Sequence, residues 1–194
     1  MEKKSKFYQN HQNFYLETYW KNNNGTDFYK PNGFNELPEN IYKAFAEQID
    51  KDGKVLDLGC GNGLMLKYLM LASGYKLIPY GVDFMKHSIK QAKEILHPQY
   101  KNNFTFGNVI NYSFNKGPFD FIFVPLHHIH PSDRKEYLDK IKKSFSKNGK
   151  IIFYEYSDAL NAEKQEWIGA YPELRGWNIE RKDYPGVSIG IFIG

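Results

Sequence analysis

The chain has 194 residues, a length that suits one globular domain. Hydrophobic residues make up 41% and charged residues 25%, which excludes disorder of the whole chain. The net charge of +4 comes from lysines spread along the sequence and not gathered in one block. Clustered charge is the footprint of a nucleic-acid partner, so no DNA binding is predicted.

One cysteine, Cys60, excludes an intrachain disulfide. No apolar stretch approaches the roughly 18 residues of a membrane-spanning helix. The basic first residues are not followed by an apolar run, so they do not resemble a secretory signal. We therefore expect a cytoplasmic protein that does not enter a membrane.

The first 33 residues are polar, aromatic and rich in asparagine, and we expect them to form an appendage to a domain at 34–194. Apolar and aromatic side chains between Tyr8 and Trp20 predict a short helix in this appendage. A second helix is expected to start near Pro38, where a missing N–H costs little. Its apolar stripe consists of Ile41, Phe45 and Ile49.

From Lys54 onward, short apolar runs alternate with stretches of helical periodicity. We predict strands at 55–58, 79–83, 104–106, 119–124, 150–156, 177–181 and 187–193. Helices are predicted at 64–71, 85–96, 132–145 and 159–168, with Ser132 as a cap and Gly149 as the end of the third. Such alternation is typical of an α/β fold with a parallel sheet covered by helices on both faces. The four residues 183–186 are too few for a parallel crossover, so the last two strands are expected to form an antiparallel hairpin.

The first predicted strand of this sheet ends in the run Asp57-Leu58-Gly59-Cys60-Gly61-Asn62-Gly63. Glycines at alternate positions allow a sharp turn and close approach of a ligand to the backbone. Asp83 ends the second strand, where a carboxylate can accept hydrogen bonds from two ribose hydroxyls. A dinucleotide fold requires G-x-G-x-x-G, but Leu64 occupies the position of the third glycine, which disfavours a nicotinamide oxidoreductase.

VLDLGCGNG at 55–63 and GVD at 81–83 resemble the first two motifs of the class I S-adenosylmethionine-dependent methyltransferases. The resemblance extends from about Ile41 to the C-terminus. It implies a Rossmann-like, seven-stranded, mostly parallel sheet that ends in an antiparallel hairpin. It also implies S-adenosylmethionine as cofactor and S-adenosylhomocysteine as product.

The resemblance implies a cofactor site around the glycine run. Asp57 would hold the ammonium, Gly59 and Gly61 would pack against the ligand, and Asp83 would bind the ribose. The other residues of this implied site are Cys60, Gly63, Phe84 beside the adenine, Asn108 and Val109 at its edge, and Pro125 with Leu126 after the fourth strand.

Histidines follow the fourth strand, in the segment that the resemblance places beside the methyl group. His128, or its neighbour His127, is a candidate general base, because imidazole titrates near neutral pH. No acidic or cysteine side chain stands near them in sequence, so no metal site is predicted. Tyr15, Tyr19 and Trp20 would either close over the substrate as a lid or cover the sheet as core.

The expected reaction is methylation of an oxygen, nitrogen or carbon atom of a small molecule. Two alternatives stay open: methylation of a macromolecule such as tRNA or a protein, and cofactor binding without catalysis. The oligomeric state is not readable from the sequence.

Overall fold

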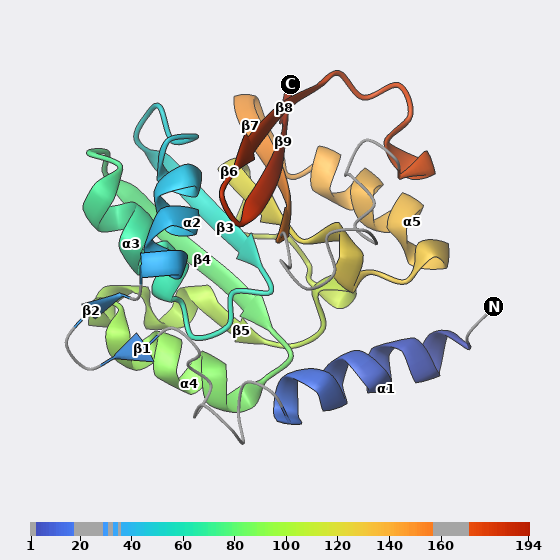
Figure 1. Cartoon of the computed structure of the whole chain (residues 1–194), viewed down its shortest axis with the longest axis horizontal. Coiled ribbons are helices and arrows are strands. Elements are labelled where there is room, and N and C mark those ends of the chain that lie inside the picture. Colours follow the sequence, from blue (N-terminus) through green and yellow to red (C-terminus); the bar gives the residue numbers. More distant parts are fainter. Residues whose placement is uncertain (1–2, 18–28, 31–32, 35, 157–170) are drawn as a thin grey trace.

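A computed structural model of the chain describes residues 3–17, 29–30, 33–34, 36–156 and 171–194 (Figure 1). Its main sheet has seven strands in the order β5-β4-β3-β6-β7-β9-β8. These strands are β3 (Gly53–Leu58), β4 (Leu77–Asp83), β5 (Phe104–Phe106), β6 (Phe119–Val124), β7 (Phe145–Tyr156), β8 (Ile179–Tyr184) and β9 (Val187–Ile193). The five strands from β5 to β7 pair in parallel, and β9 pairs antiparallel with both β7 and β8. The predicted α/β sheet with its C-terminal hairpin is therefore confirmed.

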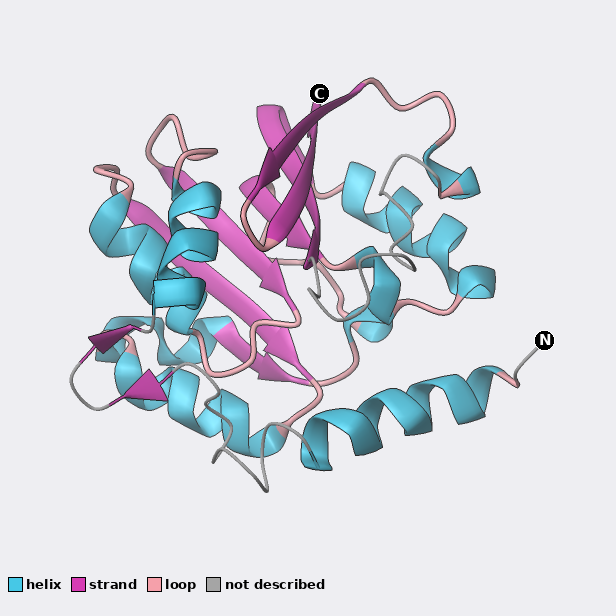
Figure 2. Cartoon of the chain, viewed as in Figure 1, coloured by secondary structure: helices cyan, strands magenta, loops and turns pink. Residues whose placement is uncertain are grey.

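Helices lie on both faces of the sheet (Figure 2). The α-helices are α1 (Lys4–Tyr15), α2 (Glu36–Ala46), α3 (Leu64–Ala72), α4 (Lys86–Ile95) and α5 (Pro131–Lys142). Short 3-10 helices are η2 (Pro98–Asn103), η3 (Val109–Asn111), η4 (Leu126–His128) and η7 (Pro172–Leu174). A separate two-stranded sheet pairs β1 (Tyr29–Lys30) with β2 (Gly33–Phe34). Among the described residues, no helix has the length and apolar character needed to cross a bilayer.

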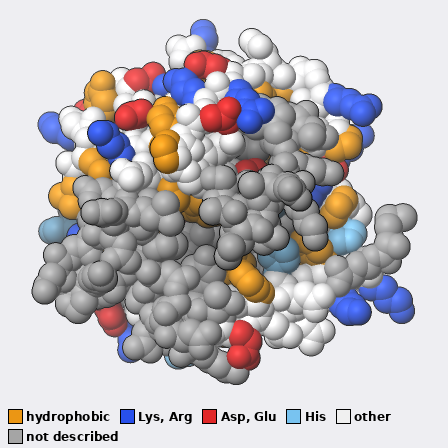
Figure 3. Space-filling view, in the orientation of Figure 1, with side chains coloured by type: hydrophobic (Ala, Val, Ile, Leu, Met, Phe, Trp, Pro, Cys, Tyr) orange, Lys and Arg blue, Asp and Glu red, His pale blue; other side chains and the backbone are white. Residues whose placement is uncertain are grey.

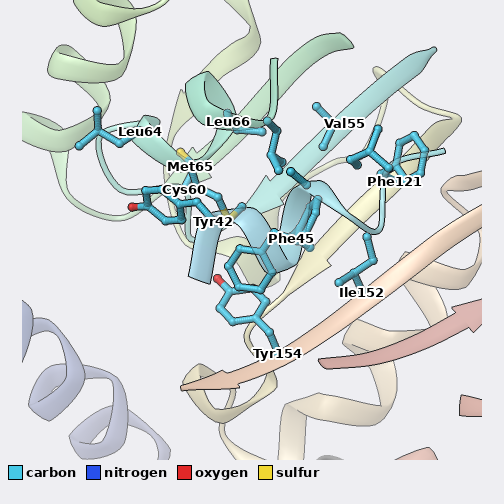
Figure 4. Close-up of a cluster of buried hydrophobic side chains, with 14 of the residues drawn as sticks. Tyr42, Phe45, Val55, Cys60, Leu64, Met65, Leu66, Phe121, Ile152 and Tyr154 are labelled. Atoms are coloured by element: carbon cyan, nitrogen blue, oxygen red, sulfur yellow. The ribbon is translucent and has the colours of Figure 1, made fainter. Parts of the chain in front are cut away.

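Two hydrophobic clusters hold the layers together. One packs α2, α3 and α4 on one face of the sheet, and the other packs α5 on the opposite face. Figure 4 shows the first cluster, in which Tyr154 projects from β7 toward Phe45 of α2, with ring centroids 5.0 Å apart. Because successive side chains of a strand alternate between faces, Tyr154 and Tyr156 share the α2 face while Glu155 points to the α5 face.

Two predicted boundaries around α5 are wrong. Pro131 occupies the first helical position, so the cap is His130, whose side chain accepts a hydrogen bond from the Ser132 N–H. The helix ends at Lys142, because Phe145 pairs with Phe119 and begins β7. Backbone pairing at the sheet therefore overrides the helical spacing of Phe145.

The C-terminal hairpin is tighter than predicted. The strand β8 begins at Ile179 and runs to Tyr184, so only Pro185 and Gly186 form the turn. Gly186 has a φ of 88°, which favours glycine. Trp177 lies before the strand and packs on Phe192, with ring centroids 4.7 Å apart. The helix predicted at 159–168 lies outside the described residues.

Candidate functional site

A cavity of about 420 Å³ opens at the carboxyl ends of β3, β4, β6 and β7. This is where open α/β sheets bind ligands. The turn after β3 forms one wall, with φ angles of 93° at Gly59 and 50° at Gly61. An added Cβ at Gly61 would meet no heavy atom within 4 Å, so the glycine turn leaves open space on the cavity side.

Two carboxylates line the cavity beside this turn. Asp83 is buried, and its two oxygens accept hydrogen bonds from the backbone N–H groups of Gly61 at 2.9 Å and Met85 at 2.7 Å. Burial raises the pKa of Asp83 to about 6, although these two hydrogen bonds act in the opposite direction. The turn is thereby tied to the end of β4.

Asp57 is the more unusual of the two acids. Its side chain is 2% exposed, and its Oδ1 has no hydrogen-bond partner among the described residues. Burial, reinforced by the nearby Asp83 carboxylate, raises the pKa of Asp57 to about 8. Buried polar atoms normally have a hydrogen-bond partner, so Asp57 Oδ1 is open to a donor that the described residues do not supply.

Most residues that the sequence assigned to the cofactor line this cavity: Asp57, Gly59, Cys60, Gly61, Asp83, Phe84, Asn108, Val109 and Pro125. Gly63 and Leu126 do not line it. Gly63 packs toward Ala92 and Leu96, and Leu126 is fully buried in the cluster on the α5 face. The Asn108 side-chain oxygen accepts from the Ile110 N–H at 3.0 Å and thereby caps η3. A second lone pair on that oxygen is left for a ligand donor.

The two candidate bases face different surroundings. His128 lines the cavity, and its Nε2 lies 2.5 Å from the Tyr15 hydroxyl. Burial lowers the pKa of His128 well below its ordinary value, and His127 and His11 lower it further. His127 is not part of the cavity lining; its Nδ1 lies 2.7 Å from Glu155, which also accepts from the Tyr171 hydroxyl. Within the described part of the chain, no three potential ligands are grouped as a metal site would require.

The helix α1 lies beyond the carboxyl ends of β3 and β4, separate from the helices that cover the sheet (Figure 1). Tyr8, His11 and Tyr15 from this helix line the cavity. No residue of α1 is buried. Tyr8 attaches the helix to α5, because its hydroxyl donates to Asp133 at 2.7 Å and accepts from the His130 N–H at 3.1 Å.

The sequence analysis singled out Tyr15 but not Tyr8 and His11, although their spacing of three and four residues places them on one helical face. Tyr154 and Tyr156 at the end of β7 also line the cavity and were missed. Their alternation along a strand was the available signal. Tyr19 and Trp20 lie outside the described residues.

On the face shown in Figure 3, Lys and Arg side chains are scattered around the outline with Asp and Glu between them. The described part of this face shows no block of positive charge.

The methyltransferase domain family matches residues 55–149 of the chain. No curated protein matches it in sequence. Similar solved structures include a Burkholderia thailandensis 1,6-didemethyltoxoflavin-N1-methyltransferase with bound 1,6-didemethyltoxoflavin and S-adenosylhomocysteine. It is 15% identical, with a TM-score of 0.69, over 100% of this chain and 91% of the other.

A methyltransferase from Aquifex aeolicus, described as S-adenosylmethionine-dependent, is 16% identical with a TM-score of 0.60, over 100% of this chain and 99% of the other. An O-methyltransferase family protein from Burkholderia thailandensis is 13% identical with a TM-score of 0.62, over 80% of this chain. The chain spans only 55% of that protein and 57% of a similar structure from Nostoc punctiforme. The family match covers just under half of the chain and the similar solved structures share its fold, so residues 55–149 form a methyltransferase domain within a fold shared with S-adenosylmethionine-dependent methyltransferases.

Proposed function

We propose that the chain transfers the methyl group of S-adenosylmethionine to a small-molecule acceptor. The observation that carries this proposal is the buried Asp57 oxygen without a partner at the wall of the cavity. A buried carboxylate is costly unless it is paired, and the ammonium group of the cofactor is a matching donor. The unpaired acid thus selects a ligand with a positive charge at this position.

Asp83 fits the ribose of the same cofactor. Each of its oxygens already accepts one backbone N–H, and a carboxylate offers about four lone-pair sites. Two acceptor sites therefore remain for the two ribose hydroxyls. Phe84 follows directly at the cavity wall, where the adenine would lie beside it, with Asn108 and Val109 at the edge of the ring.

When bound, S-adenosylmethionine supplies a methyl group that its sulfonium has already activated, so the protein contributes mainly proximity and orientation. We assign the general base to His128 and not to His127, because only His128 lines the cavity. Its lowered pKa leaves the ring neutral, which is the form that accepts a proton. Tyr15 holds His128 at Nε2 and thereby orients the ring toward the acceptor.

The small size of the cavity supports a small acceptor, since it lies in the lower part of the range of about 300–1,000 Å³ for ligand pockets and must hold cofactor and acceptor together. The similar Burkholderia thailandensis N1-methyltransferase was solved with a small molecule and S-adenosylhomocysteine, which agrees with this proposal. We further infer a cytoplasmic location, because the single cysteine rules out any intrachain disulfide.

The test begins with calorimetric titration of S-adenosylhomocysteine into the purified full chain and its Asp83→Ala variant. Hydrogen bonds to a charged group are worth about 1.5–3 kcal/mol, so Asp83→Ala should weaken binding at least roughly tenfold. Equal affinity of both proteins would remove Asp83 from the site. No binding to the unaltered chain would exclude the proposed function.

The base is tested by turnover, once a screen has identified an acceptor. His128→Ala should lower kcat by about 10²–10⁴-fold and leave the affinity for S-adenosylhomocysteine nearly unchanged. His127→Ala serves as the matched control and should have a much smaller effect. Normal kcat in His128→Ala, with an acceptor that is protonated at the assay pH, would show that the ring only shapes the cavity.

A further inference from the structure

Several aromatic side chains that the cofactor assignment does not use line the cavity. They come from three separate parts of the chain: Tyr8, His11 and Tyr15 from α1, His128 from η4, and Tyr154 and Tyr156 from β7. The residues assigned to the cofactor instead follow β3, β4, β5 and β6. The six side chains from α1, η4 and β7, called here the aromatic wall, are available to the acceptor, and the rings of Tyr42 and Phe106 line the cavity as well.

From this wall we infer that the methyl acceptor is an uncharged, planar aromatic or heteroaromatic molecule with an O–H or N–H group, bound between α1 and the end of β7. The inference rests on the proposed function, because it identifies the partner of the same site. It goes further in naming the chemical class that the wall can recognise.

The rings of the wall contact one another edge to face. Tyr15 and His128 have centroids 5.3 Å apart at 78°, and His11 and His128 have centroids 5.5 Å apart at 71°. The ring centroids of Tyr15 and Phe84 lie 6.0 Å apart, which connects the wall to the residues assigned to the cofactor. Edge-to-face neighbours expose both ring faces and ring edges, and these are the surfaces on which another flat ring packs best.

The charges of the described lining disfavour an anionic acceptor. Among the described lining residues, the only carboxylates are Asp57 and Asp83, and there is no lysine or arginine. A carboxylate or phosphate ester would lie close to these two acids, and the described lining offers no lysine or arginine to pair with it. Burial of an unpaired charge is strongly unfavourable.

A cationic acceptor is disfavoured for a different reason. The two acids that would attract it are those assigned to the cofactor, and the cofactor brings a sulfonium into the same cavity. Two positive charges close together in one cavity repel each other. An uncharged acceptor avoids both penalties.

The polar atoms of Tyr15 and His128 can form hydrogen bonds with an O–H or N–H group on such a ring. The Tyr15 hydroxyl and His128 Nε2 lie 2.5 Å apart at the cavity surface. In the proposed step, His128 donates its Nε2–H to the Tyr15 oxygen, the acceptor loses its proton to His128 Nδ1, and the freed lone pair of the acceptor forms the bond to the methyl carbon. The carbon–sulfur bond breaks with its electron pair remaining on sulfur, and His128 then releases the proton to water.

The experiment measures binding of four matched probes to the full chain already saturated with S-adenosylhomocysteine. The probes are 2-naphthol, 2-naphthoate, 2-naphthylmethylammonium and decahydro-2-naphthol, which vary the charge and the aromaticity of one skeleton. We expect 2-naphthol to bind at least roughly tenfold more tightly than each of the others, which is the ratio that about 1.4 kcal/mol produces. Equal or tighter binding of the anion, the cation or the saturated alcohol would overturn the inference.

A pair of variants locates the binding. Tyr156 lies in the wall and is 40% exposed, whereas Tyr75 lies outside the lining and is 38% exposed. Tyr156→Leu should lower the affinity for 2-naphthol about three- to tenfold without changing the affinity for S-adenosylhomocysteine. Tyr75→Leu should leave both affinities unchanged. If S-adenosylhomocysteine binds but 2-naphthol does not, or if Tyr156→Leu has no effect, the inference fails while the proposed function stands. If S-adenosylhomocysteine itself does not bind, the proposed function fails.

Discussion

Asp57 is the residue whose ionisation should control cofactor binding. Burial and the neighbouring Asp83 raise its pKa to about 8, so the free protein holds this carboxyl protonated below that pH. A ligand ammonium pairs with the ionised form, so binding must release the proton. The pKa is raised in the free protein, and the work of deprotonation therefore grows as the pH falls.

We expect affinity for S-adenosylhomocysteine to rise by roughly tenfold or more between pH 6 and pH 8, since each pH unit below the pKa contributes up to tenfold. Calorimetry in two buffers of different ionisation enthalpy should detect release of about one proton near pH 6.5. Asp57→Asn is the control and should bind weakly with little pH dependence. An affinity of the unaltered chain that stays constant over this range would contradict the assignment.

Cys60 and Gly81 show how tightly the two motifs pack. A Cβ added at Gly81 would lie 2.6 Å from the Cys60 sulfur and 2.9 Å from the Phe104 ring. Gly81→Ala should therefore destabilise the protein by about 1–3 kcal/mol, as overpacking of a core does. Denaturant unfolding measures this, with Gly107→Ala as the control, because a Cβ there meets no atom within 4 Å. Equal stability of both variants would mean that the turn relaxes freely around Cys60.

At the scale of the element, α1 contributes to the wall of the cavity without being part of the core. None of its residues is buried, and its described links to the domain include the hydrogen bonds of Tyr8 and Tyr15. Hydrogen bonds contribute only about 0.5–1.5 kcal/mol each to stability. The cavity, however, obtains part of its wall from this helix.

Deletion of residues 1–17 should therefore leave a cooperatively folded domain that still binds S-adenosylhomocysteine but has lost most of its turnover. Tyr8→Phe is the milder variant and should raise KM for the acceptor severalfold, because it removes the hydroxyl between Asp133 and His130. Thermal unfolding, calorimetry and kinetics separate these effects. An unfolded truncated chain would show that these aromatics are core and not a lid.

At the scale of the whole molecule, cofactor binding should stabilise the domain by mass action. The site joins groups that follow four strands of one sheet, so a ligand in it binds only the folded chain. At about 100 times Kd, S-adenosylhomocysteine should add about 2.7 kcal/mol. For a chain of this length that corresponds to a rise in Tm of roughly 5–11 °C.

Differential scanning calorimetry with and without S-adenosylhomocysteine checks this shift. At the same ligand concentration, Asp83→Ala should show a smaller rise in Tm than the unaltered chain. His128→Ala should show the same rise in Tm as the unaltered chain. A Tm that does not respond to millimolar ligand would show that the cavity does not hold the cofactor.

The sequence by itself determined the sheet and identified the residues of the proposed cofactor half of the site. Buried strands are nearly continuous apolar runs, and the glycine turn, Asp57 and Asp83 lie at the ends of two such runs. The strands and the turn can therefore be recognised in the sequence alone. The start and end of α5 were not predicted correctly from the sequence. Pro131 makes His130 the cap, and the pairing of Phe145 with Phe119 ends the helix.

The proposed acceptor half of the site depends only on the tertiary structure. Tyr15 is separated from His128 by 113 positions, and Tyr154 reaches the same cavity from β7, so no local pattern connects them. Which of two adjacent histidines enters the cavity depends on the path of η4 after β6. The lack of a partner for Asp57 Oδ1 likewise arises only on folding. In the unfolded chain water donates to the aspartate, and burial removes that water.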